Sequence, residues 1–471
     1  MRLRCWRNCF IPCLLLAVAG GLTGCTTYNE QNRFAEPWMR GDLATAEKEA
    51  TRKADKAVGS KDEIIWRLEQ ATILRTAGKY DESNQAFDQA QAKIDRYAEA
   101  AKVKLGSEAG ALFSNQASVP YRGRPYDGIM LNTYRALNFL AKHEPDKARV
   151  EIIRAYQRQQ DAVEDNKRRI ETTEEALKQE KEKKRIEKAQ KNPEFQGSVK
   201  QAYSSLDTLK AYSDYVNPFT VYLDGLIFLA NGVDASDLER ARKSFERVAA
   251  FTDNNRFVKA DLDSLEALGR GKAPEKLTYI IFENGRAPVR DQVRIDIPIF
   301  FTRLSYIGAA FPKLELQGGQ LSALKVTAGG TNDTTALLAS VDSVIAQDFK
   351  NELPTIITKT IAATVAKGAA GYALNEVANQ EGGGIAGLIS QIGTAVYQLS
   401  VNIADLRTWT TLPKEFQICR IPTPADRKVE LHAMGSGQQA VVTLDDGLIN
   451  LIYVRSTSAG GPMFVSQMKL K

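Results

Sequence analysis

The sequence predicts an α+β protein in which an N-terminal domain of paired helices with a long helical hairpin precedes an antiparallel β-sandwich-like domain. Up to residue 272 the apolar residues recur at helical spacing, with small residues where paired helices would cross. From residue 275 the spacing changes to the period of two that is typical of half-buried strands. We therefore expect domains at 41–272 and 275–471, the second carrying a helical insert at 335–404. A hydrophobic content of 43% is sufficient for a core in each.

The N-terminus has the pattern of an export signal. Three arginines precede an apolar run and a set of small residues, and Leu22-Thr23-Gly24-Cys25 follows. This stretch resembles the lipobox of bacterial lipoproteins, in which the cysteine is linked to diacylglycerol. We expect residues 1–24 to be a lipoprotein signal peptide, Cys25 to be the lipidation site and 25–40 to be a tether. The alternative is a soluble exported protein with a chance cysteine. Thr26 in place of aspartate favours, by resemblance to the sorting rule, the outer membrane.

The first helices resemble tetratricopeptide (TPR) units. Gly41-Asp42-Leu43 is followed by Ala46 and Ala50, and Gly78-Lys79-Tyr80 starts a second, clearer copy 37 residues later (78 − 41). Ala71 lies where a TPR unit needs a small residue for close helix contact. Weaker copies follow around residues 136–155 and 241–248. We expect TPR-like helical repeats, and an ordinary helical bundle is the alternative.

A turn-rich aromatic segment, Pro120–Asp127, precedes the helix that we expect at 128–142. Its aromatic residues Tyr121 and Tyr126 are candidates for binding a peptide or carbohydrate partner. The alternative, which we favour, is that they hold an inter-helix loop against the helices.

Residues 146–216 predict a long helical hairpin. One helix is expected over 146–192, with a seven-residue apolar repeat at Tyr156, Val163, Ile170 and Leu177. Pro193 would end it, and the apolar residues after Gly197 would supply the returning partner. We interpret the many lysines and glutamates of 167–191 as a solvated face, and binding to anionic lipid or glycan is the alternative.

The C-terminal half contains alternating segments at 277–282, 293–299, 324–326 and 429–431, and an apolar run at 448–454. Helices interrupt these strands. We expect two of them around Pro354, over 341–353 and 356–378, and a further uncharged segment with an apolar repeat at 385–403. We expect this insert to fold as a hairpin against the sheet, whereas a membrane-facing or oligomerising element is the alternative.

No residue pattern predicts a catalytic, cofactor or metal site. The two histidines, His143 and His432, are far apart, and Cys419 is the one cysteine beyond Cys25. There is no nucleophile elbow and no phosphate-binding glycine loop. The formal net charge of +6 falls to about +3 without the three signal arginines, so a nucleic-acid partner is not expected.

The stretch Asp405-Leu406-Arg407-Thr408-Trp409-Thr410-Thr411-Leu412-Pro413, with Pro120–Asp127 and Ala136-Leu137-Asn138, is similar to an uncharacterised family of Gram-negative lipoproteins. Its members have TPR-like N-terminal helices and a D-x-R-x-W-x-x-L-P motif in the C-terminal domain. They tend to be encoded beside lipoproteins that resemble activators of penicillin-binding proteins. The resemblance implies a role in envelope assembly and carries no activity. From the residues themselves, we expect Trp409 to be a core anchor and Asp405 to pair with Arg407, with partner binding through these three residues as the second possibility.

The expected function is that of a non-enzymatic protein-binding scaffold or adaptor, anchored by lipid in the outer membrane and facing the periplasm. Its expected partners are the membrane, through the lipid, and a periplasmic or outer-membrane protein. The first alternative is an activator of a peptidoglycan synthase, and the second, of another class, is a cell-wall glycan hydrolase.

Overall fold

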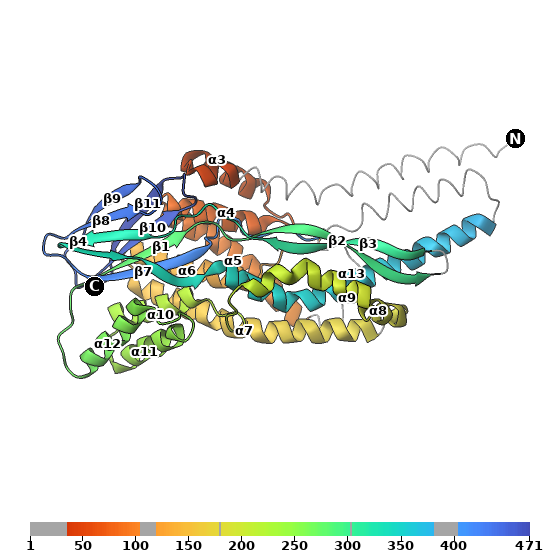
Figure 1. The fold of residues 1–471 in the computed structure, drawn as a ribbon, viewed down its shortest axis with the longest axis horizontal. Helices are drawn as coiled ribbons and strands as arrows, with labels where there is room; N and C mark the ends of the chain where they lie inside the picture. Colours follow the sequence, from red (N-terminus) through yellow and green to blue (C-terminus); the bar gives the residue numbers. More distant parts are fainter. Residues whose placement is uncertain (1–34, 104–118, 179, 302–303, 381–403) are drawn as a thin grey trace.

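The computed structural model describes residues 35–103, 119–178, 180–301, 304–380 and 404–471, and it has the predicted α+β architecture. Most helices of the N-terminal half and two of the sheets form a head, and an elongated arm extends from it along the long axis (Figure 1). Among the described residues, no helix is both long enough and apolar enough to span a bilayer.

The helices of the head pack as successive pairs. The described helices before the first strand are α3 (Leu43–Lys56), α4 (Glu63–Thr76), α5 (Tyr80–Val103), α6 (Pro125–Ala141), α7 (Pro145–Lys178), α8 (Lys183–Gln190), α9 (Pro193–Tyr203), α10 (Pro218–Asn231), α11 (Ala235–Ala249) and α12 (Arg256–Gly269).

The glycine and small-residue pattern of the predicted repeats has a direct structural cause. Gly41 and Gly78 both adopt positive φ, of 73° and 77°, in the turns that precede α3 and α5. Ala71 of α4 is fully buried, and its carbonyl accepts a hydrogen bond of 2.8 Å from the Ser83 hydroxyl of α5. Such a close approach needs small side chains where the two helices cross, so the predicted small-residue contact of Ala71 between α4 and α5 is confirmed.

The predicted tether is shorter than expected at its C-terminal end. Residues 35–40 are helical, and Trp38 is fully buried with the Arg455 guanidinium over its ring. The carbonyl of Met39 accepts hydrogen bonds from the hydroxyls of Thr457 and Ser458. The buried ring of Trp38 therefore fixes this segment against the β domain, although the segment was expected to be a tether.

The strands of the described residues form three sheets. They are β1 (Leu277–Asn284), β2 (Val289–Phe301), β3 (Leu304–Glu315), β4 (Leu324–Ala328), β5 (Thr331–Thr334), β6 (Ala336–Ser340), β7 (Glu415–Pro422), β8 (Lys428–Ala433), β9 (Gln439–Thr443), β10 (Ile449–Ser456) and β11 (Met463–Lys469). The larger head sheet has the order β11-β10-β1-β7-β6, and the smaller has the order β5-β4-β8-β9. The third sheet is the β2–β3 hairpin of the arm.

One strand pair departs from the expected antiparallel arrangement. β1 and β10 run parallel at the centre of the larger sheet, with Leu277 opposite Ile449. The period-two pattern determines which side chains share a face, but neither the partner strand nor its direction. The chain between β1 and β10 includes the β2–β3 hairpin, the smaller sheet and the helix of the insert, α13 (Val341–Gln380), and a connection of this length allows the two strands to run parallel.

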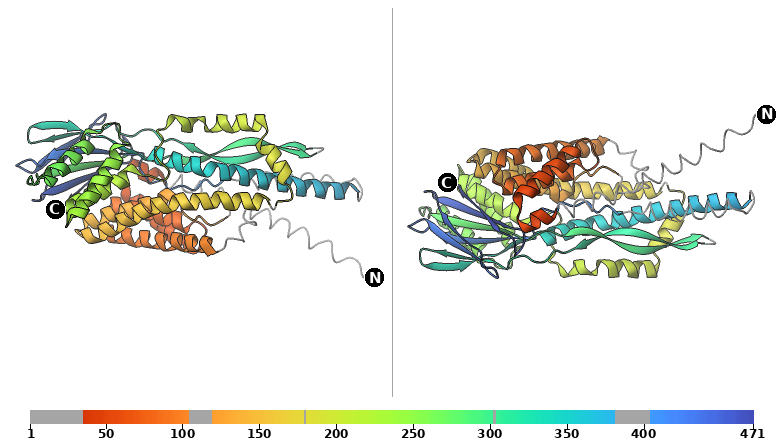
Figure 2. Two further views of the ribbon diagram at one scale, coloured as in Figure 1. Left: turned by 90° about the horizontal axis from the view of Figure 1, so that it is seen from below. Right: turned by 90° about the horizontal axis from the view of Figure 1, so that it is seen from above.

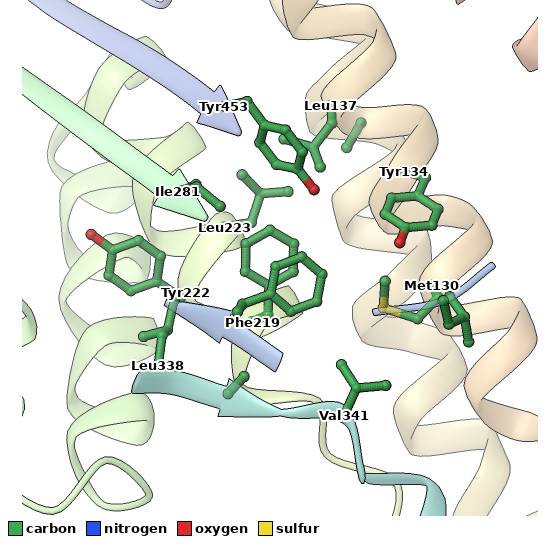
Figure 3. Packing of buried hydrophobic residues seen from close by; sticks show 14 of the residues in the cluster. Met130, Tyr134, Leu137, Phe219, Tyr222, Leu223, Ile281, Leu338, Val341 and Tyr453 are labelled. Carbon is green, nitrogen blue, oxygen red and sulfur yellow. The ribbon is translucent and has the colours of Figure 1, made fainter. Parts of the chain in front are cut away.

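The head core joins the helices to the larger sheet. Met130, Tyr134 and Leu137 of α6 face Phe219 and Leu223 of α10, with Tyr453 and Ile281 of the sheet beside them (Figure 3). The ring of Phe219 stacks on that of Phe416 at 3.7 Å between centroids.

The arm contains β2, β3, α8, α9, the C-terminal part of α7 and the long helix α13 (Val341–Gln380). In both views of Figure 2, α7, α9 and α13 run along the arm beside the hairpin. Its own core is aliphatic apart from the ring pair Phe195–Phe311, and it includes Ile297 and Ile361.

The predicted long hairpin over 146–216 takes another form. α7 ends at Lys178 rather than at residue 192, and it packs on α13, while α8 and α9 pack on β2. The predicted seven-residue repeat is not the buried stripe either, because Val163 is 48% exposed while Gln159 and Thr173 are buried. The Gln159 side chain accepts a hydrogen bond from the Asn217 backbone N–H, so a polar residue outside the predicted apolar repeat is buried here.

The insert also differs from the expected pair of helices around Pro354. α13 continues through this proline as one helix of 40 residues. Ile361, Ala362 and Val365 are buried against the β2–β3 hairpin, so the described part of the insert packs on a sheet, as expected. The apolar repeat predicted at 385–403 lies outside the described residues.

Candidate functional site

The segment 404–412 connects the two halves of the molecule. The Asp405 carboxylate accepts hydrogen bonds from the Arg407 guanidinium at 2.8 and 3.0 Å, which is the expected pair. Arg407 is 5% exposed, and it also donates to the Asp62 carboxylate and to the Val119 carbonyl, both at 3.0 Å. One side chain of the C-terminal half therefore joins three separate segments of the chain.

Trp409 is fully buried between helices of the N-terminal half. Its ring makes edge contacts with Phe87 and Tyr134, at 6.1 and 5.8 Å between centroids. The indole N–H lies 3.0 Å from the Thr72 hydroxyl and 2.9 Å from that of Thr411. Trp409 therefore occupies the position of a core anchor, as the sequence indicated.

The next two residues bind a buried carboxylate. Glu69 of α4 is fully buried, and it accepts hydrogen bonds from the backbone N–H groups of Thr410 and Thr411 at 2.6 and 3.0 Å. The Thr410 hydroxyl donates to it as well. Burial raises the pKa of Glu69 to about 7, although these hydrogen bonds oppose the shift.

The predicted aromatic segment lies beside this connection. Tyr121 and Tyr126 are buried, and the Tyr121 hydroxyl donates to Asp127, which also accepts from the Arg124 backbone N–H at 2.8 Å. The guanidinium of Arg407 lies 5.4 Å from the centre of the Tyr121 ring. Burial raises the pKa of Asp127 to about 6. The loop is held against the helices, which is the interpretation we favoured.

A cluster of charges joins the arm to the head. Glu352 of α13 accepts hydrogen bonds from Arg124 at 2.8 and 3.0 Å and from Arg290 of β2 at 2.7 Å. Burial would raise the pKa of Glu352, but the two guanidinium groups outweigh it and hold this pKa well below its ordinary value. Burial and the charge of Glu352 raise the pKa of Asp348 to about 7.

We call this set of contacts the seam. Its members are Asp62, Glu69, Tyr121, Arg124, Tyr126, Asp127, Arg290, Asp348, Glu352, Asp405, Arg407 and Trp409. All five residues that the sequence singled out as partner-binding candidates lie in it. In this conformation they contact one another and the chain around them, so partner binding through them stays a prediction. Cys25 lies outside the described residues.

The sequence analysis missed five further members of the seam, namely Asp62, Glu69, Arg290, Asp348 and Glu352. A signal was present for Glu69, because it lies within Ile64–Ile73, where apolar residues occupy every face of the helix. A charge at such a position must be paired or hydrogen-bonded. Arg290 and Glu352 gave no comparable signal, since each lies among other polar residues.

Two cavities of the described residues lie away from the seam. One of about 550 Å³ is lined by α11, α12 and the sheet, with Asp263, Ser264 and Arg420 among its polar groups. Another of about 480 Å³ lies at the junction of α8 and α9 and is lined by three lysines and Phe300. Neither is lined by a residue of the seam. Within the described ranges, no cluster of three His, Cys, Asp or Glu side chains is suitable for a metal ion.

Comparison of the chain with protein-family models, with curated proteins and with solved structures gave no match in any of the three.

Proposed function

We propose that the protein is a lipid-anchored lipoprotein of the outer membrane that faces the periplasm and acts as a non-enzymatic scaffold or adaptor in envelope assembly. The anchor rests on Leu22–Cys25, and the scaffold role rests on the shape and packing of the described residues.

The observation that carries the scaffold role is the location of the perturbed carboxylates. Active sites concentrate titratable groups of shifted pKa in a cleft that substrate can enter. Here Glu69 and Glu352 lie in the seam, where they accept hydrogen bonds from guanidinium, backbone and hydroxyl groups of the chain itself. Asp261, whose pKa is raised by burial to about 6, lies outside the seam and accepts hydrogen bonds from the buried hydroxyls of Tyr222 and Tyr279. This location supports a structural role for the carboxylates of the seam, which is to hold the head and the arm in a fixed arrangement.

A fixed arrangement of this kind suits an adaptor. The head and the arm present separate surfaces, so two partners bound to them would be held at a constant distance (Figure 1). A lipid anchor would add the high local concentration that turns a weak encounter into an effectively intramolecular one.

Metabolic labelling with a palmitate analogue tests the anchor. We expect the wild-type chain to be labelled, Cys25→Ala to be unlabelled, and the matched control Cys419→Ala to be labelled, because Cys419 is a buried strand residue. An unlabelled wild-type chain would overturn lipid anchoring.

Crosslinking in whole cells followed by mass spectrometry tests the scaffold role. We expect envelope proteins as partners, and a peptidoglycan synthase as the dominant partner would support the activator alternative. Digestion of purified cell wall by the protein, lost when one carboxylate pair is changed, would replace both with the hydrolase alternative.

A further inference from the structure

The edges of the described sheets differ in how well their backbone groups are protected. An unpaired edge strand is a template for another strand, and proteins normally protect it with charges, prolines, bulges or covering segments. Every edge strand of the described residues except β9 has such a device.

The protected edges use several of these means. β6 has a bulge between Leu337 and Ala339, and Asn255 donates to the Leu337 carbonyl at 2.9 Å. β5 has four residues, and Arg256 of α12 pairs with its Asp333.

The remaining protected edges use proline or covering chain. The β2–β3 hairpin carries Pro298 and Pro312, which remove backbone donors, and helices pack along it. β11 is half-buried over residues 463–467, with α6 packed near it and Gly41 against Pro462.

Apart from its short length, β9 has none of these devices. Its five residues, Gln439–Thr443, contain no charge, proline or bulge, and Val441 is 66% exposed. β9 lies at the outer margin of the smaller sheet, and β8 is its one partner (Figure 1). Three of its residues, Val441, Val442 and Thr443, are of types with high β propensity.

The register with β8 shows which backbone groups of β9 face outward. The Gln438 carbonyl accepts from the Ala433 N–H, and the Leu444 N–H donates to the Arg427 carbonyl. Since successive residues alternate in direction, residues 438, 440, 442 and 444 direct their backbone groups to β8. Gln439, Val441 and Thr443 therefore direct theirs to the free edge, and these groups have no hydrogen-bond partner within the described part of the chain.

We propose that the β9 edge binds the same edge of a second copy of this chain, in an antiparallel, two-fold symmetric pair centred on Val441. In this register Val441 lies opposite its own copy, and Gln439 lies opposite Thr443 of that copy. Each of these pairs exchanges both backbone hydrogen bonds, because these are the residues whose groups point outward. The exposed Val441 side chain gains an apolar partner, and no like charges are brought together.

Self-association explains β9 better than capture of a foreign strand. A two-fold pair requires a surface that is complementary to itself, and an uncharged strand with valine at its centre meets that requirement. A pair of five-residue strands buries less than the roughly 1,200 Å² of a stable interface. The dimer is accordingly weak at low concentration in solution and is favoured where copies are concentrated.

Disulfide trapping tests the pair. Cα atoms of a hydrogen-bonded antiparallel pair lie about 5.5 Å apart, within the range that a disulfide spans. We expect mild oxidation of the full-length Val441→Cys chain to give a covalent dimer above the background of the wild-type chain. Val233→Cys is the matched control, because Val233 is 85% exposed but lies in the turn before α11.

Sedimentation velocity over a range of concentrations provides a second measurement without a new thiol. Val441→Lys places two like charges at the centre of the pair and should abolish the concentration-dependent dimer. Val441→Thr, which keeps a β-branched residue, and Val233→Lys should retain it. A monomer at every concentration together with equal trapping of Val441→Cys and Val233→Cys would overturn the proposal. Trapping of Val441→Cys to another protein instead of to itself would overturn it too.

Discussion

The seam buries carboxylates and guanidinium groups beside aromatic rings, whereas the core of the arm consists of isoleucine, valine, alanine and the pair Phe195–Phe311. Apolar packing depends on volume and is tolerant of rearrangement. A buried ion pair needs its specific partner, since removing one member leaves an uncompensated charge. The seam therefore specifies how the parts are oriented, while the arm core stabilises the packing of the helices on the hairpin.

The largest effect should come from the aromatic anchor of the seam. Trp409→Ala removes the contacts with Phe87 and Tyr134 and a buried hydrogen bond, so we expect the free energy of unfolding to fall by about 3–5 kcal/mol. Urea denaturation measures it. Because the seam joins the halves, the loss should accompany exposure of both to hydrogen exchange, and an effect confined to segment 404–412 would contradict a joining role.

A matched truncation in the arm should lower the free energy of unfolding of the arm by about 2–4 kcal/mol and leave the head unaffected. Ile297→Ala removes a fully buried side chain between the hairpin and α13. We expect hydrogen exchange to accelerate in β2, β3 and α13 while the larger head sheet stays protected. Equal acceleration in the head sheet would show that arm and head unfold as one unit.

The pH dependence should separate two glutamates of the same seam. The pKa of Glu69 is raised from 4.5 to about 7, so the folded chain binds this proton more tightly than the unfolded chain. The contribution of Glu69 to stability is therefore largest below pH 4.5 and is lost as the pH rises to about 7. Glu69→Gln, which we expect to cost about 1–3 kcal/mol at pH 5, should cost less at pH 8.

Glu352→Gln is the control with the opposite sign. Its pKa is lowered, so its contribution is present above the ordinary value of 4.5 and is lost as the pH falls below it. The cost of Glu352→Gln should therefore shrink toward acid pH, as measured by urea denaturation at several pH values. If the stability cost of both variants changed with pH in the same direction, the inference that the two carboxyl groups lie in opposite electrostatic environments would be wrong.

The smallest effect should be that of Tyr126→Phe. The Tyr126 hydroxyl lies 3.4 Å from that of Thr408, a long hydrogen bond, and the buried ring is retained. We expect a loss of about 0.5–1 kcal/mol in the free energy of unfolding. A loss as large as that of Trp409→Ala would place the main strength of the seam in this loop rather than in the anchor.

The sequence by itself indicated the helices of the first half and the strands at 277–282, 293–299, 324–326, 429–431 and 448–454, because each period in apolar residues belongs to one local geometry. It did not indicate β6, which lies within the insert that we expected to be helical. It also indicated the buried residues that carry an unusual demand, such as Ala71 at a helix crossing and Trp409 after the insert. The local pattern was sufficient for these predictions because each depends on the residue types found within one or two helical turns or along one strand.

Only the tertiary structure decided which elements pair. The parallel match of β1 with β10, the packing of α7 on α13 and the meeting of Arg124 with Glu352 join residues far apart in the chain. The predicted apolar repeat of α7 failed because burial there follows the partner that arrives, and a hydrogen bond satisfies the buried Gln159. Periodicity indicates the buried face of an element only where its partner covers that face, and a charge or a strand edge acquires its partner only when the chain folds.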